Sequence, residues 1–270
     1  MPSAAHDFDS DLAWPSAIMD LSSHRVVAVI QARMASTRLP GKVLRRIAGK
    51  PMIGWIAERL HACKEVDEVV LSTTQNSRDD AIARFANREK LPCFRGSGED
   101  LIDRLYCTAR EHEGDALVRI TGDCPFVDPE IVDELVRRFK ESYGQVDYVT
   151  NNFPPTFPHG LDAEVWPAAT LSRLWQEIRD PYYREWFPLY VKERNRNPFR
   201  ILNVSSPVNL SDLRWTVDYP EDLVFARRVF RSLGGSGMVF RVADVLALIR
   251  RRPELKQINI SRLERHAASP

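Results

Sequence analysis

Short apolar runs alternate with helical patterns through the first half of the chain. The runs predict strands at residues 26–30, 69–73, 91–94 and 117–120. Apolar residues spaced three or four positions apart predict helices that start near Pro51, Ala81, Leu101 and Pro129. Strands that alternate with helices in this way predict a mostly parallel, doubly wound α/β sheet covered on both faces.

The pattern changes after about Asp147. Residues 151–160 hold three prolines, two asparagines and a glycine, which predicts a loop. Mixed strands and helices are expected over 161–216, and later helices near 220–230 and 242–251. Four tryptophans in this half are predicted to lie in the core: Trp166, Trp175, Trp186 and Trp215. We expect one domain at 25–260 with an inserted lobe at about 151–213, and terminal tails at 1–24 and 261–270.

Composition excludes several classes of protein. The chain has 270 residues, 44% of them hydrophobic and 28% charged, with a net charge of +1. Such a balance gives no global field for nucleic acid or a membrane surface, and the apolar runs are too short to span a bilayer. Residues 1–24 lack the pattern of a signal peptide. The four cysteines show no Cys-x-x-Cys spacing, so we expect free thiols, no zinc and a cytoplasmic location.

Three cations follow the first predicted strand without an acidic residue among them: Arg33, Arg38 and Lys42. Guanidinium, ammonium and backbone N–H groups at a strand end suit a polyphosphate. The segment is not a Walker A loop, because it lacks the first glycine and the Ser/Thr after lysine. It also lacks a Gly-x-Gly-x-x-Gly fingerprint. A solvated basic turn is the alternative interpretation.

Two aspartates stand just beyond predicted strands. Asp123 lies in Arg119-Ile-Thr-Gly-Asp-Cys-Pro125, and Asp218 lies in Arg214-Trp-Thr-Val-Asp-Tyr-Pro-Glu-Asp222. Ligands of open α/β sheets bind at the carboxyl ends of the strands, which is where both side chains are expected. Each aspartate alone is also explained as a turn residue or a helix cap.

The string Gln-Ala-Arg-x-x-Ser-x-Arg-Leu-Pro-Gly-Lys, followed by Gly49-Lys-Pro-Met-Ile53, resembles the cytidylyltransferases that make CMP-linked acidic sugars. These are the CMP-Kdo synthetases and the acylneuraminate cytidylyltransferases. The resemblance runs from about Val26 to Ile260 and is strongest to the branch named after spore-coat polysaccharide biosynthesis protein F. It implies a glycosyltransferase-A-like nucleotidyltransferase fold with a small dimerisation lobe in a homodimer. It also implies Mg²⁺-dependent use of CTP and release of pyrophosphate, in surface polysaccharide biosynthesis.

The resemblance also assigns roles to residues of this chain. Catalytic contacts to the triphosphate fall to Arg33, Arg38 and Lys42. The metal ligands are Asp123 and Asp218, since Mg²⁺ takes one or two protein carboxylates. The nucleotide is expected to contact Ala32, Arg33, Ser72, Thr73, Ser97, Arg104 and Gly122. The acceptor is expected to contact His159, Asp162 and Glu164.

Alternatives remain open for several of these assignments. A surface ion pair with Asp100 would also explain Arg104, and a half-exposed strand would explain 159–165. The branch pattern Glu-His-Val-Thr is replaced near Arg184 by Glu-Trp-Phe, so Trp186 and Phe187 predict a less polar or differently shaped acceptor.

The partners expected are CTP and a small acidic acceptor, without nucleic acid or membrane. Another NTP such as UTP, a phosphate or phosphonate acceptor, a glycosyltransferase of similar fold and a silent scaffold are the other interpretations.

Overall fold

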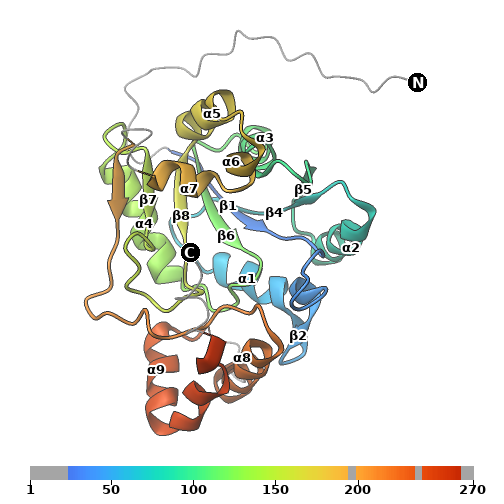
Figure 1. Ribbon diagram of the computed structural model, residues 1–270, viewed down its shortest axis with the longest axis vertical. Helices are drawn as coiled ribbons and strands as arrows, with labels where there is room; N and C mark the ends of the chain where they lie inside the picture. The colour runs from blue at the N-terminus through green and yellow to red at the C-terminus, as the bar shows by residue number, and fades with distance from the viewer. Residues whose placement is uncertain (1–23, 194–198, 235–238, 263–270) are drawn as a thin grey trace.

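A seven-stranded sheet forms the centre of the molecule in the computed structural model, which describes residues 24–193, 199–234 and 239–262 (Figure 1). From edge to edge the strands are β5 (Cys93–Gly96), β4 (Glu68–Thr74), β1 (Val26–Gln31), β6 (Ala116–Thr121), β8 (Glu164–Pro167), β7 (Tyr148–Thr150) and β9 (Ile201–Asn203). A separate hairpin pairs β2 (Arg46–Ile47) with β3 (Lys50–Pro51). The predicted tail at 1–24 lies almost wholly outside the described residues, as does most of 261–270.

Strand β8 runs against the direction of its neighbours. β5, β4, β1 and β6 are mutually parallel, whereas β8 pairs antiparallel with both β6 and β7. Because of this reversal the first residue of β8, Glu164, lies opposite Arg119 near the end of β6. The start of β8 therefore faces the same sheet edge as the carboxyl ends of β1 and β6. The prediction of a mostly parallel sheet is confirmed.

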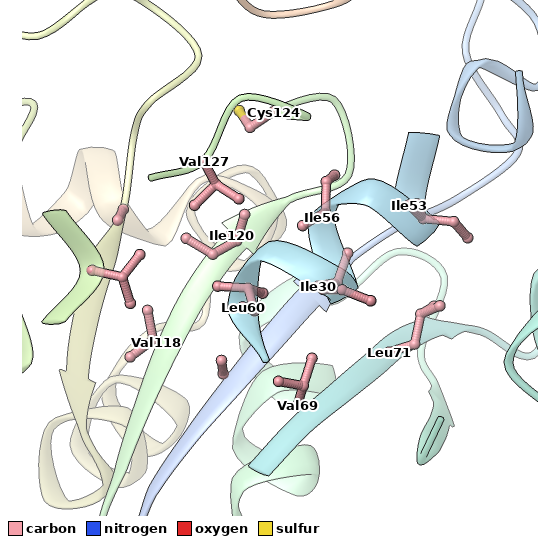
Figure 2. Packing of buried hydrophobic residues seen from close by; sticks show 14 of the residues in the cluster. Ile30, Ile53, Ile56, Leu60, Val69, Leu71, Val118, Ile120, Cys124 and Val127 are labelled. Carbon is pink, nitrogen blue, oxygen red and sulfur yellow. The ribbon is translucent and has the colours of Figure 1, made fainter. Parts of the chain in front are cut away.

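Helices cover both faces of the sheet. One face packs against α1 (Met52–Leu60), α2 (Asp80–Glu89) and α4 (Pro129–Glu141), and the other against α3 (Leu101–Glu111), α5 (Ala168–Glu177) and α7 (Phe187–Lys192). Figure 2 shows Ile53, Ile56 and Leu60 of α1 over the apolar side chains of the strands. Residues of β1 alternate between the two clusters, which is why its whole run is apolar.

A third apolar cluster, the C-terminal cluster, underlies the C-terminal part of the chain. It joins α8 (Pro220–Leu233), α9 (Val242–Arg251) and the 3₁₀ helix η5 (Pro253–Ile258) to Phe126 and Trp215. In Figure 1 these helices, coloured orange to red, form a layer at the bottom of the molecule. Asp222 is buried at the start of α8 and accepts hydrogen bonds from the backbone of Asp218 and Tyr219. This capping places Asp218 immediately before the helix.

Residues 151–213 contribute β8, β9 and three helices to the body around the central sheet, including the short α6 (Pro181–Glu185), which contacts α3. Trp166 and Trp215 are buried as predicted, but Trp186 is 55% exposed, so the core prediction is wrong for that residue. Its neighbour Phe187 is fully buried against Trp166. No helix in the described ranges has the length and apolar character needed to cross a bilayer.

Candidate active site

Two adjoining chambers open at the carboxyl edge of β1 and β6. The loop chamber, of about 570 Å³, is lined by the loop after β1 together with Leu101, Glu185, Trp186 and Leu189. The β8 chamber, of about 740 Å³, is lined by residues around the start of β8 and by Lys192. Six residues line both chambers: Arg38, Arg119, Thr121, Asp123, Trp186 and Asp218. A molecule in one chamber would therefore meet a molecule in the other at Asp123 and Asp218.

The loop after β1 is anchored by its backbone and one apolar side chain. The N–H of Ala32 donates to the carbonyl of Ser72 (3.0 Å), and the N–H of Met34 donates to the buried carboxylate of Asp79 (2.7 Å). Leu39 is 7% exposed within the C-terminal cluster. Gly41 then adopts φ +64°, a left-handed conformation that suits glycine, directly before the 3₁₀ helix η2 (Lys42–Leu44).

Lys42 bridges the two predicted metal ligands. Its Nζ lies 2.6 Å from Oδ2 of Asp123 and 2.7 Å from Oδ1 of Asp218. Arg38 approaches the same Oδ1 of Asp218 to 2.8 Å while remaining half exposed. Lys42, Asp123 and Asp218, which come from three separate sequence motifs, are therefore in direct contact with one another through Lys42. Arg38 contacts the same cluster through Asp218.

Close backbone packing brings the two aspartates together. Gly122 donates to the carbonyl of Gln31 (2.8 Å), and a Cβ at this glycine would lie 2.9 Å from that oxygen. The N–H of Val217 donates to the carbonyl of Asp123 (2.8 Å). The buried side chain of Arg214 donates a hydrogen bond from Nη2 to Oδ2 of Asp218 (3.1 Å). The positions of both carboxylates are therefore determined by the fold, as a binding site requires.

The charges of this cluster reinforce one another. Burial alone would raise the pKa of Asp218, but Lys42, Arg38 and Arg214 outweigh it and lower the pKa to about 2. The pKa of Asp123 is also lowered, because Lys42 and the Thr121 hydroxyl outweigh burial. Burial opposes the charge of Lys42, yet the two carboxylates together raise its pKa. Both aspartates are thus anionic at neutral pH.

The arrangement fits a divalent cation that keeps most of its waters. Both carboxylate oxygens lie within 2.7 Å of one ammonium nitrogen, so a single cation can bridge them. Within the described ranges, no group of three or more His, Cys, Asp or Glu side chains could form a cage of protein ligands. Two carboxylates with solvent completing the shell is the usual way in which Mg²⁺ is held.

Several residues predicted to contact the nucleotide lie below the surface of the loop chamber. Ser72, Thr73 and Arg104 are fully buried. The hydroxyl of Ser72 is hydrogen-bonded with that of Thr108, and Arg104 donates to the backbone carbonyl of Ser97. The alternative ion pair of Arg104 with Asp100 is not formed, because Asp100 pairs with Arg184 instead. The nucleotide roles of these residues stay predictions.

Glu185 stands between buried Arg104 and the loop chamber. Its Oε1 lies 3.0 Å from Nη1 of Arg33, which is 44% exposed at its side chain. Burial lowers the pKa of Arg104 to about 10, and Glu185 is the carboxylate that opposes this shift most. Sequence reasoning missed Glu185, although it is the one residue of the Glu-His-Val-Thr pattern that this chain retains.

The predicted acceptor residues gather in the β8 chamber. His159, Asp162 and Glu164 all line it, although Asp162 precedes β8 rather than lying within it. The carboxylate of Glu164 is 2.5 Å from Nη1 of Arg119 and accepts from the Tyr148 hydroxyl at 2.7 Å. Glu164 is 4% exposed, so it holds Arg119 at the chamber wall. Acceptor binding by these residues remains a prediction.

Lys192 is a further cation of the β8 chamber that the sequence did not single out. Its Nζ donates to Oδ1 of Asn152 (2.7 Å), and among the described residues its nearest carboxylate is Glu164, at 3.9 Å. Burial lowers its pKa despite Glu164. A lysine near the end of a short helix carries no local sequence signal, so only the fold reveals it.

Trp186 and Phe187 lie in different environments, one exposed and one buried. Phe187 is a core residue that lines neither chamber, although its ring lies near Arg119, which lines both. The expected change in the acceptor stays a prediction. Trp186 lines both chambers and is largely exposed. The aromatic substitution in this chain therefore places one large apolar side chain where the two chambers meet.

Comparison with known proteins agrees with this geometry. A family model described as cytidylyltransferase matches residues 27–204. The spore coat polysaccharide biosynthesis protein SpsF of Bacillus subtilis is 29% identical over 85% of this chain and 95% of its own. The 3-deoxy-manno-octulosonate cytidylyltransferase of Acidobacterium capsulatum is 34% identical over 47% of this chain and 51% of its own. A solved cytidylyltransferase from Leptospira borgpetersenii superposes with a TM-score of 0.82 at 33% identity, over 87% of this chain and 97% of that one. The chain belongs to the cytidylyltransferase family.

Proposed function

We propose that this nucleotidyltransferase transfers CMP from CTP to a small acidic acceptor, with Mg²⁺ and with release of pyrophosphate. The observation that carries the proposal is the convergence of Lys42, Asp123 and Asp218 at the wall between two chambers. One chamber is bordered by the cationic loop and suits a triphosphate. The other is large enough for a sugar-sized molecule at about 740 Å³.

In-line transfer needs the attacking acceptor oxygen and the leaving pyrophosphate to lie on opposite sides of the α-phosphorus. The triphosphate would lie along Arg33, Arg38 and Lys42, whose charges neutralise the pyrophosphate as it leaves. Mg²⁺ bound by Asp123 and Asp218 would supply further neutralisation of the phosphates. The acceptor oxygen is proposed to attack the α-phosphorus directly, without a covalent enzyme intermediate, because positioning and charge neutralisation carry such transfers.

The β8 chamber supports an acidic acceptor. Of its cations, Arg38 is paired with Asp218 and Arg119 with Glu164. Lys192 is left with a neutral amide partner and a carboxylate at 3.9 Å. An acceptor carboxylate, phosphate or phosphonate beside Lys192 would compensate for its burial. The Acidobacterium relative is named for its action on a sugar acid, 3-deoxy-manno-octulosonate, which agrees with this class.

Cellular setting is part of the same proposal. We propose a cytoplasmic homodimer that serves surface polysaccharide biosynthesis. The four cysteines are free thiols, which suits a reducing compartment. The name of the Bacillus subtilis relative supports the polysaccharide role.

The test is pyrophosphate release from CTP and Mg²⁺ with a panel of sugar acids, phosphates and phosphonates, with the product identified by mass. We expect a CMP-linked product from one class of acceptor and none from Asp123→Asn. Equal or greater turnover with UTP, ATP or GTP would refute the choice of CTP. Release of a nucleotide from CMP- or UDP-sugars, without pyrophosphate formation from any NTP, would instead indicate a glycosyltransferase.

A further inference from the structure

The carboxylate of Glu185 has unused capacity to accept hydrogen bonds. Glu185 ends α6 and lines the loop chamber. Its Oε1 is paired with Arg33, but its Oε2 is buried and has no hydrogen-bond partner within the part of the chain that the structure describes. A buried acceptor left without a donor is costly, so its retention points to a ligand that supplies one.

Buried Arg104 lies behind this carboxylate. It is fully buried, donates through Nη1 to the carbonyl of Ser97, and interacts more strongly with Glu185 than with any other charge. Its Nε also lacks a partner among the described residues. Because Arg104 does not line the loop chamber, Glu185 is the group through which it can act on a ligand.

The lining of the loop chamber around Glu185 suits a flat base. Leu101, Pro188 and Leu189 provide apolar surface, and Trp186 adds an aromatic face. Of the cations on the loop after β1, Arg33 lies beside Glu185, whereas Arg38 and Lys42 lie at Asp218. A nucleotide whose phosphates follow that loop would direct its base towards α6 and the start of α3.

An ionised carboxylate can only accept hydrogen bonds. Cytosine presents an amino donor at N4, whereas uracil presents an acceptor, O4, at the same position. Beside Glu185, cytosine would form an N–H···O bond, while uracil would bring two acceptors together with no proton between them. Sites of this kind reject the analogue because a buried polar group is left unpaired.

We propose that Glu185 accepts a hydrogen bond from the N4 amino group of CTP and thereby selects cytosine over uracil. This inference rests on the proposed function. When the triphosphate draws Arg33 towards the phosphates, the N4 amino group replaces it beside the carboxylate.

The rival interpretation is that Glu185 only neutralises Arg33 and Arg104. It predicts that removing the charge weakens every nucleotide by the same factor. The two interpretations separate in the ratio of CTP to UTP affinity, which needs no knowledge of the acceptor.

The experiment measures binding of CTP and UTP to the full-length protein by calorimetry with Mg²⁺ present. Wild type is expected to prefer CTP by about 10²-fold or more, and Glu185→Gln to reduce that ratio at least about tenfold, since the amide can turn its NH₂ to O4. Glu177→Gln is the matched control, because Glu177 pairs with an arginine on the exposed face of α5 and touches neither chamber. Circular dichroism reports the fold of each variant.

A second measurement uses only the wild-type protein. The triphosphate of N4,N4-dimethylcytidine has no N4 donor and is expected to bind as weakly as UTP. Binding of this analogue as tight as that of CTP, or an equal loss of CTP and UTP affinity in Glu185→Gln, would overturn the assignment while leaving the cytidylyltransferase proposal intact. A wild type that binds CTP no better than UTP would overturn both.

Discussion

Replacing Lys42 with methionine tests the centre of the site. The substitution keeps a long apolar stem but removes the ammonium that lies within 2.7 Å of both Asp123 and Asp218. The side chains of all three residues are mostly shielded from solvent, Lys42 and Asp218 at 12% exposure each and Asp123 at 24%. The variant therefore leaves two carboxylates facing one another with less solvent to screen them.

The magnitude follows from the pKa of Asp218, which falls from 3.8 to about 2 in the folded protein. A shift of that size corresponds to about 2.5 kcal/mol of stabilisation of the charged form. Because the pKa is lowered, this stability is present in full above about pH 4 and is lost as the pH falls through 2. Lys42 is the largest favourable contributor, so we expect Lys42→Met to lose about 2 to 3 kcal/mol at pH 7.

The assay is urea unfolding of wild type and Lys42→Met at pH 7 and at decreasing pH, together with steady-state pyrophosphate release. The difference in unfolding free energy should shrink between about pH 4 and pH 2, where the aspartates become protonated. Turnover at saturating CTP should fall by about 10²-fold or more, because the lost charge acts on the leaving pyrophosphate. Lys140→Met, which breaks one ordinary ion pair with Glu65, is the control. A variant with wild-type stability at pH 7 and unchanged kcat would refute the reasoning.

Three further predictions follow from the described contacts. Asp123→Asn and Asp218→Asn should each fold, as judged by circular dichroism, yet lose most pyrophosphate release; retention of wild-type rates by both would remove them from the metal site. Lys192→Met should raise the KM for the acceptor about tenfold or more, with the KM for CTP unchanged, since only the β8 chamber loses a cation. Gly160→Ala should cost more than about 3 kcal/mol in thermal or urea unfolding, because Gly160 has φ +106° and its Cβ would lie 2.2 Å from a backbone nitrogen. Gly234→Ala, with open space around the new Cβ, should be close to neutral.

Local patterns in the sequence determined much of the fold. The alternation of apolar strands with helical stripes located β1, β4 and β6 within one residue at each end, and α9 at its observed bounds. The antiparallel course of β8 was not predictable in this way. Its direction depends on pairing with β6 and β7. β6 ends 43 positions before β8 begins and β7 ends 14 positions before it, and no local pattern encodes pairing over such separations.

The same distinction between local patterns and distant contacts applies to the residues of the site. Lys42, Asp123 and Asp218 were found because each sits in a short motif. The strand predicted before Asp218 was wrong, since that segment forms only an isolated bridge at Arg214. Glu185 and Lys192 were not assigned roles, because they reach the chambers only after α6 and α7 have packed against the sheet and α3. The burial of Phe187 was not predictable for a related reason, since an apolar residue in a polar motif is equally consistent with a binding surface and with the core.

Asn259 gives the end of the chain a part in assembling the reactive centre. It is 3% exposed and donates to the carbonyl of Arg214 (3.0 Å) and to the carboxylate of Asp222 (2.8 Å). Those two residues in turn hold Asp218. During synthesis the N-terminal strands and helices can collapse first, but Asp218 gains this support only after Asn259 has left the ribosome. A product that ends before Asn259 would therefore keep the phosphate-binding loop but lose the brace on Arg214 and Asp222, and we expect its second carboxylate to be held less firmly.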